Sequence, residues 1–165
     1  MRAPWLTQGY LGEPVRSAEL WRGGWLHTGD VGVVDADGYL KIVDRIKDVV
    51  KTGGEWVSSL DVEDLILRVP GIAEAAVVGV PDERWGERPV ALVVAKAGYC
   101  PRPTADAIRA HIASHAERGD ISRYAVPDRV EFVDAIPKTS VGKLDKKLIR
   151  ASLIAACEPT RATTP

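Results

Sequence analysis

The sequence predicts a small α+β domain in which helices pack against a short sheet. Two short apolar runs, 75–80 and 89–95, indicate buried strands. Between residues 62 and 69, apolar side chains recur at spacings of three and four residues, the pattern of a helix with one buried face. Beyond residue 45 the predicted elements follow the order β-β-α-β-β-α-β-α, and this mixed order is typical of α+β domains.

Residues 1–24 show little clear apolar period, and proline and glycine punctuate them. Their aromatic side chains need a surface to pack on, and so short a segment cannot build a core of its own. We therefore expect this segment to end a preceding domain. Residues 30–43 predict a β-hairpin, since apolar residues alternate on both sides of a turn at 35–38 in which Gly38 can take positive φ.

Residues 46–57 predict a second, shorter pair of strands that turns at Gly53 and Gly54. Ser58 or Ser59 then caps the helix that carries the apolar stripe. A proline–glycine pair ends that helix, because proline cannot continue it and glycine tolerates the conformation that closes a helix.

The second half of the chain supplies the remaining elements. Residues 81–87 predict a polar loop between the two buried strands. Thr104 is placed to cap a further helix, 129–133 indicate a third strand, and 145–156 predict a final helix. We expect residues 157–165 to form a flexible tail.

Charge and composition exclude several functions. Lys and Arg number 22 against 23 Asp and Glu, so no basic excess favours nucleic acid or an anionic membrane. The two cysteines lack metal-ligand spacing, and no apolar run reaches the roughly 20 residues of a membrane span. No signal peptide is visible, and we expect a cytoplasmic protein.

His111 and His115 lie one helical turn apart, a spacing that allows a metal pair. A solvated helix face is favoured instead, because no third ligand is near in the sequence. We therefore predict no metal site.

Four segments, in this order and with these spacings, resemble the adenylate-forming superfamily of acyl-CoA synthetases, peptide-synthetase adenylation domains and luciferases. They are Trp25–Asp30, Asp44–Glu55, Val80–Glu87 and Pro137–Lys143. A Thr-Gly-Asp turn alone would mean little, whereas all four together make chance agreement improbable. A Gly-Gly-Glu-Trp segment followed by two serines is most similar to the medium- and long-chain fatty acyl-CoA ligases.

The resemblance implies that residues 45–156 form the small mobile C-terminal lid domain of such an enzyme, and that 1–44 are a remnant of the large N-terminal AMP-binding domain, ending in a hairpin and a hinge. The implied activity is an ATP-dependent acid–thiol ligation, in which a fatty acid, ATP and CoA give acyl-CoA, AMP and pyrophosphate. A reactive acyl-adenylate is formed first and is shielded from water while the lid turns between the two steps. ATP would bind with Mg, whose ligands are not in this chain, and CoA is a substrate.

The family's phosphate loop, adenine pocket and acyl tunnel belong to the N-terminal domain, so the resemblance implies an N-terminal partner domain or subunit, and we expect this portion to be inactive without it. Two alternatives remain. The chain could be a non-catalytic remnant or an interaction module. It could instead be an acyl-adenylating module that loads a carrier protein, although the Gly-Gly-Glu-Trp segment argues against this.

Three residues match family positions near the nucleotide and the hinge. Asp30 matches the ribose-binding aspartate, and its alternative role is that of a turn residue. Arg45 matches a residue that contacts ribose or phosphate through its rigid donor fork, and its alternative is an ion pair with Asp44 or Asp48. Lys47 occupies the hinge position, which is compatible with its also being a solvated lysine.

The resemblance also implies a place for CoA. Gly53 and Gly54 would lie along the pantetheine tunnel, where the absence of Cβ lets backbone approach a narrow ligand. Trp56 could line that tunnel or fill the core.

Lys143 is the predicted catalytic residue. It follows a glycine in what we expect to be a flexible loop, and its ammonium would orient the carboxylate and offset charge at the α-phosphate. Its alternative is an exposed lysine among several others. Arg84, Trp85 and Arg88 could meet the CoA phosphates or a partner domain, or could belong to a plain polar loop.

Overall fold

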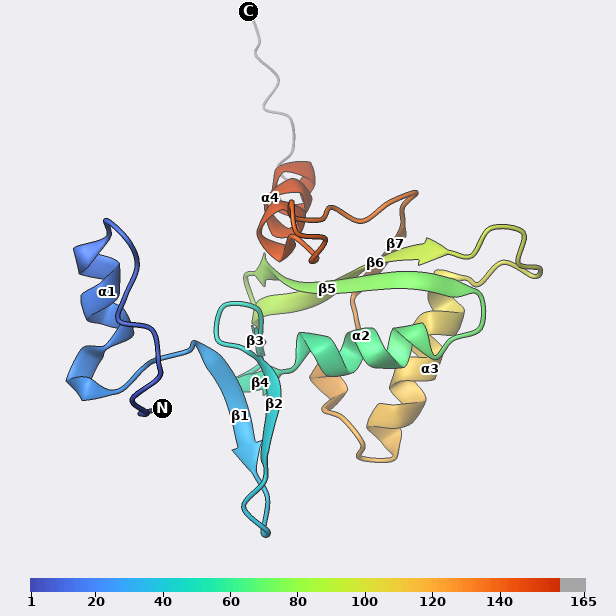
Figure 1. Cartoon of the computed structure of the whole chain (residues 1–165). Helices are drawn as coiled ribbons and strands as arrows, with labels where there is room; N and C mark the ends of the chain where they lie inside the picture. Colours follow the sequence, from blue (N-terminus) through green and yellow to red (C-terminus); the bar gives the residue numbers. More distant parts are fainter. Residues whose placement is uncertain (158–165) are drawn as a thin grey trace, which may run out of the picture. The chain divides into compact units, whose positions relative to one another are not determined.

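The computed structural model describes residues 1–157 (Figure 1). Contacts divide the chain into two compact units, Met1–Lys47 and the part that begins at Asp48. The first unit contains α1 (Pro14–Leu20), the 3-10 helix η1 (Arg22–Gly24) and the antiparallel strands β1 (Asp30–Val34) and β2 (Leu40–Arg45).

The hairpin predicted over 30–43 is confirmed as β1 and β2. Its turn is closed by Asp35, whose Oδ1 accepts hydrogen bonds from the backbone N–H groups of Asp37 at 3.0 Å and Tyr39 at 2.8 Å. Gly38 takes the left-handed conformation that such a turn requires, with φ of 86°.

Residues 1–24, in which the sequence shows little clear period, contain α1 and η1. Pro14 occupies the first turn of α1, where its fixed φ suits a helix and its missing N–H is not needed. The indole of Trp21 donates to the carbonyl oxygen of Thr7 at 3.0 Å and ties the preceding segment to the helix. Since α1 buries no residue, its sequence carries no apolar period that could reveal it.

The second unit contains a five-stranded sheet and three longer helices. Its elements are β3 (Val50–Thr52), β4 (Glu55–Val57), α2 (Ser59–Leu67), β5 (Ile72–Asp82), β6 (Gly86–Ala95), α3 (Ala105–Glu117), the 3-10 helix η2 (Arg123–Ala125), β7 (Arg129–Phe132) and α4 (Lys146–Cys157). The strands follow the order β4-β3-β6-β5, with β7 pairing in parallel with β6.

Both faces of this sheet are covered, with α2 and α3 on one side and α4 on the other (Figure 1). Along β5, Ala75 and Val77 pack with α2 and α3, whereas Ala76 and Val78 pack with α4. Because successive strand residues point to opposite faces and both faces are buried, the strands carry the continuous apolar runs seen in the sequence.

The predicted helix caps are confirmed. Ser58 Oγ accepts from the Asp61 N–H at 3.1 Å, and Thr104 Oγ1 accepts from the Ala107 N–H at 3.2 Å. The polar loop expected over 81–87 is shorter than predicted, because β5 and β6 extend into it from both ends.

That loop is reduced to a tight turn by Asp82, whose Oδ1 accepts from the backbone N–H groups of Arg84 at 2.9 Å and Trp85 at 2.8 Å. Within residues 1–157, none of the helices has the length and apolar character needed to cross a bilayer. Of the predicted flexible tail, Cys157 ends α4 and the remainder lies outside the described residues.

Candidate functional site

In the first unit, Asp30 and Arg45 form an ion pair across the β1–β2 ladder. They are register partners, and Arg45 Nε lies 3.6 Å from Asp30 Oδ1. Of the alternatives considered for Arg45, an ion pair is therefore present, but with Asp30. Asp30 also lines an open cavity of about 500 Å³ together with Arg22 and His27, so its carboxylate borders a space that could receive a polar ligand.

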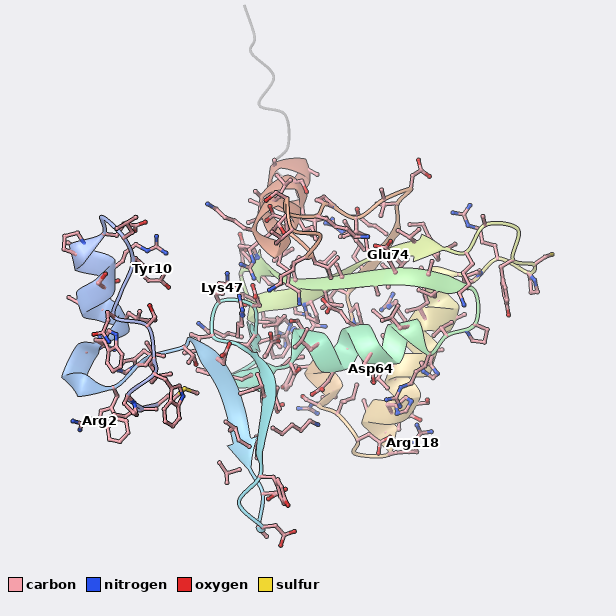
Figure 2. The ribbon with its side chains drawn as sticks, in the orientation of Figure 1. Arg2, Tyr10, Lys47, Asp64, Glu74 and Arg118 are labelled. Atoms are coloured by element: carbon pink, nitrogen blue, oxygen red, sulfur yellow. The ribbon has the colours of Figure 1, made fainter. Side chains whose placement is uncertain are left out.

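Lys47 is the last residue of the first compact unit and is exposed (Figure 2). The division of the chain directly after the residue to which we assign the hinge is compatible with that role, which stays a prediction.

In the second unit, the Gly53–Gly54 pair turns β3 into β4 as predicted. Gly53 has φ of 59° and Gly54 of 81°, and both are in the left-handed region that favours glycine. The Gly53 N–H donates to the carbonyl oxygen of Trp85 at 3.0 Å, and a Cβ on Gly53 would lie 2.9 Å from the Tyr124 ring. The turn is therefore pressed against the β5–β6 turn and η2, and only glycine fits at position 53.

Trp56 is 58% exposed, so it does not fill the core. Lys51 Nζ lies 5.7 Å from the centre of its ring. A large indole face left open beside the glycine turn is suited to contact a ligand or another domain.

A guanidinium–aromatic cluster, made of Arg84, Trp85, Arg123 and Tyr124, lies beside this turn. The two rings are 5.5 Å apart, with Arg84 stacked 4.7 Å from the indole centre and Arg123 5.0 Å from the phenol centre. Sequence reasoning singled out the first two residues and missed the others, because the two halves are far apart in sequence and meet only through the fold. Such stacked guanidinium groups provide charge and planar surface for an anionic, aromatic ligand.

Arg88 has a different role from its neighbours. Its Nε donates to Asp128 Oδ2 at 2.8 Å, and its Nη2 donates to Asp128 Oδ1. This bidentate contact lowers the pKa of the Asp128 carboxyl below its usual value. Through this contact Arg88 joins β6 to the segment before β7.

Lys143 lies in a closed turn, and not in the flexible loop expected from the sequence. The Thr139 N–H donates to the Lys143 carbonyl at 2.7 Å, and the Lys143 N–H donates to Thr139 Oγ1 at 3.3 Å. At the base of the turn, the Asp145 N–H donates to the Pro137 carbonyl at 2.9 Å. We refer to residues 137–145 as the Lys143 hairpin.

The side chain of Lys143 is exposed, and its ammonium makes no hydrogen bond or ion pair within the part of the chain that the structure describes. Its backbone is held while its charge is free. A long cationic side chain on a fixed base can reach a ligand without first breaking an internal contact.

His111 and His115 lie on α3 with ring centres 5.0 Å apart. His115 Nδ1 lies 2.8 Å from Asp120 Oδ2 and 2.8 Å from an Arg118 nitrogen. His111 Nε2 is buried without a partner, so the ring is not on a simple solvated face as expected. Among residues 1–157, no group of three or more His, Cys, Asp or Glu side chains could hold a metal ion.

Comparison with known proteins agrees with this architecture. Residues 61–143 match the family described as AMP-binding enzyme C-terminal domain. Probable acyl-activating enzyme 6 of Arabidopsis thaliana is 43% identical over 91% of this chain and 26% of its own length. A long-chain-fatty-acid–CoA ligase of Thermus thermophilus is 40% identical over 91% of this chain and 27% of its own length.

Solved structures give the same result. The amide bond synthetase McbA of Marinactinospora thermotolerans superposes with a TM-score of 0.80 at 40% identity, over 92% of this chain and 29% of that one. ATP-bound MatB of Rhodopseudomonas palustris gives 0.80 at 31% identity, over 94% of this chain and 30% of that one. The chain spans about a quarter of the length of its curated relatives. It belongs to the AMP-binding enzyme C-terminal domain family and has the small α+β fold of that domain in adenylate-forming enzymes.

Proposed function

We propose that this chain is the C-terminal portion of an ATP-dependent acyl-CoA ligase, that residues 45–156 are its lid domain, and that Lys143 is its catalytic residue in the adenylation step. The observation that carries the proposal is the exposed, unpaired ammonium of Lys143 on a hydrogen-bonded hairpin, in a domain whose relatives include acyl-CoA ligases. In the adenylation pose this ammonium would orient the substrate carboxylate and offset charge at the α-phosphate.

Asp30 and Arg45 are the proposed nucleotide ligands of the chain. A carboxylate can accept hydrogen bonds from both vicinal ribose hydroxyls, while the adjacent guanidinium can donate to ribose or phosphate oxygens. Their existing pairing at 3.6 Å is loose and partly exposed, so an incoming nucleotide could share both partners.

The thioester-forming step would use a different face of the lid. Gly53 and Gly54 would allow the pantetheine arm of CoA to lie against backbone, with Trp56 as a side wall. The guanidinium–aromatic cluster beside the turn supports the same assignment, because CoA carries both phosphates and an adenine ring. Rotation about Lys47 would exchange this face for the one that carries Lys143.

The first unit supports the need for an N-terminal partner domain or subunit. Both hydrophobic core clusters of the described residues lie entirely beyond residue 48. Large apolar side chains of the first unit are exposed, among them Trp5 at 83%, Leu11 at 102% and Tyr39 at 74%. An apolar surface of this kind is expected to pack against the domain that would hold ATP, Mg and the acyl group.

We propose a fatty acid as the acid substrate. Support comes from the Gly-Gly-Glu-Trp segment with its paired serines and from the relative that is a long-chain-fatty-acid–CoA ligase. Other relatives are named for other acyl groups. One is a feruloyl-CoA synthase of Streptomyces that is 42% identical over 89% of this chain.

The proposal is tested by a fusion enzyme in which this chain replaces the last quarter of the Thermus thermophilus relative. With ATP, Mg, palmitate and CoA, the fusion enzyme is expected to release AMP and form acyl-CoA. The chain alone and the remaining three quarters of the relative alone are the controls, and neither is expected to turn over. A folded but inactive fusion enzyme, or robust turnover by the chain alone, would contradict the proposal.

A further inference from the structure

A buried polar contact joins α2, β5 and α4 in the second unit. Lys146 Nζ lies 2.7 Å from Glu63 Oε1 and 2.7 Å from Ser59 Oγ. Glu63 Oε1 also accepts the Val77 N–H at 2.7 Å. The exposed fractions of Ser59, Glu63 and Lys146 are 0%, 7% and 9%. These three side chains are called the buried brace below.

The brace lies directly beside the proposed catalytic segment in the sequence. Lys146 is the first residue of α4 and follows Asp145, the last residue of the Lys143 hairpin. Asp145 caps α4 by accepting the Leu148 N–H on Oδ1 at 3.0 Å, while its own N–H closes the hairpin base. Fixing Lys146 therefore fixes the end of the hairpin from which Lys143 projects.

The brace also reaches the proposed CoA segment. Ser59 begins α2, one residue beyond β4, and β4 follows the Gly53–Gly54 turn. It is the second of the paired serines, of which the sequence predicted one or the other as the helix cap. Ser58 caps α2, and Ser59 Oγ accepts a hydrogen bond from Lys146 Nζ.

A second ion pair holds the hairpin, but its side chains are exposed, so it is expected to contribute less than the buried one. Lys138 Nζ lies 2.8 Å from Glu74 Oε2, and both side chains are more than 40% exposed. Exposed pairs are screened by water and contribute little, whereas loss of one partner of a buried pair leaves an uncompensated charge. Of the two ion pairs near the hairpin base, the buried brace is therefore the one whose loss is expected to matter more.

We propose that Lys146, held by Glu63 and Ser59, is a positioning residue that fixes the Lys143 hairpin and joins it rigidly to the Gly53–Gly54 segment. This inference rests on the proposed function, because the brace is proposed to position the ammonium of Lys143 for the adenylation step. With the brace intact, the two segments turn as one body, and the ammonium of Lys143 arrives at the same point in each cycle. Without it, the hairpin base shifts and the ammonium is misplaced.

The first test uses the chain itself and does not depend on activity. Amide hydrogen exchange is measured for Gly142, Lys143 and Asp145, and for core amides of β6. Lys146→Met is expected to speed exchange of the hairpin amides about tenfold more than that of β6. The matched controls are Lys147→Met, which removes an exposed neighbouring lysine, and Lys146→Arg, which keeps the charge, and both should leave the hairpin amides near wild type.

A single buried charge left behind can unfold the domain, so a second variant is needed. Glu63→Gln with Lys146→Met removes both charges and keeps a side-chain oxygen for the Val77 N–H. The fold should survive with a loosened hairpin. Unchanged hairpin exchange in this folded double variant, or an equal rise throughout β6, would overturn the proposal.

The second test uses the fusion enzyme. Lys146→Met should lower kcat of adenylation about 10- to 100-fold with little change in KM for ATP, because the ammonium is misplaced and not removed. Lys146→Arg should restore most of the loss. If the unaltered fusion enzyme is inactive, the proposed function fails while the exchange experiment still decides the brace. If the fusion enzyme is active and the Lys146→Met variant keeps its kcat, the brace has no positioning role.

Discussion

Asp30 and Arg45 face each other across β1 and β2, with the guanidinium Nε 3.6 Å from the carboxylate. Two residues assigned separately to the nucleotide from sequence motifs are therefore neighbours on one rigid hairpin. The ladder sets their spacing, so a ribose bound by Asp30, as proposed, would lie near the Arg45 guanidinium.

Replacing Asp30 tests this pair. In the fusion enzyme, Asp30→Ala should raise KM for ATP about tenfold or more, because two charge-assisted hydrogen bonds to ribose are lost. Asp37→Ala, in the exposed turn of the same hairpin, is the control and should leave KM unchanged. Equal KM values for the two variants would remove Asp30 from the nucleotide site.

The two glycines of the β3–β4 turn should differ in stability when replaced. Each has positive φ, so alanine at either position costs about 1–2 kcal/mol of unfolding free energy. Gly53→Ala should cost more than Gly54→Ala, because its Cβ would meet the Tyr124 ring, whereas nothing lies within 4 Å of a Cβ at Gly54. Urea denaturation of the chain measures both.

A Tyr124→Ala background separates the cost of positive φ from the cost of the contact with the Tyr124 ring. In Tyr124→Ala, the extra cost of Gly53→Ala should disappear and the two glycine variants should become equal. If the extra cost persists without the ring, the close contact between turn and η2 is not its origin.

The two-faced sheet predicts opposite results for neighbouring residues of α4. Ile149 is fully buried against β5 and β6, and Ile149→Ala should lower the unfolding free energy by about 2–5 kcal/mol. Leu148 is 53% exposed, and Leu148→Ala should change it by less than about 0.5 kcal/mol. Similar losses at both positions would mean that α4 does not pack by this face.

Stability should also fall in mildly acidic solution because of His111. Burial lowers the pKa of His111 below its ordinary value of 6.5, and the nearby His115, Arg118 and Arg68 lower it further. His111 is therefore protonated more readily in the unfolded chain than in the folded chain. As a result, the free energy of unfolding declines as pH falls below about 6.5.

Denaturation between about pH 7 and pH 5 isolates this effect, since Asp120 and Asp128 have pKa values lowered from 3.8 and lose their contribution only in stronger acid. His111→Gln should flatten the decline in that window. A decline of the same steepness in this variant would assign it to other groups.

Sequence patterns were most informative where burial is one-sided or complete. The stripe on α2, the strands β5 and β6 and the caps Ser58 and Thr104 all leave local signals, because core packing and backbone hydrogen bonds constrain neighbouring residues. The helix α1 left none, since it buries nothing within this chain.

In the candidate site, too, some residues have a local signal in the sequence and others do not. Motifs located Asp30, Gly53 and Lys143, each within a few residues of a glycine or turn. They did not reveal that Tyr124 packs on Gly53, nor that Glu63 and Lys146 form a buried pair, because these contacts join segments far apart in sequence. Such partners depend on topology, and a single sequence carries no local mark of them.

The most direct test of the account is to measure the two half-reactions of the fusion enzyme separately for Lys143→Ala. Adenylation should slow about 100-fold or more, while thioester formation from supplied acyl-adenylate should stay near wild type. Lys147→Ala, an exposed lysine on the following helix, should affect neither step. Equal losses in both half-reactions for Lys143→Ala would contradict a role for its ammonium in adenylation.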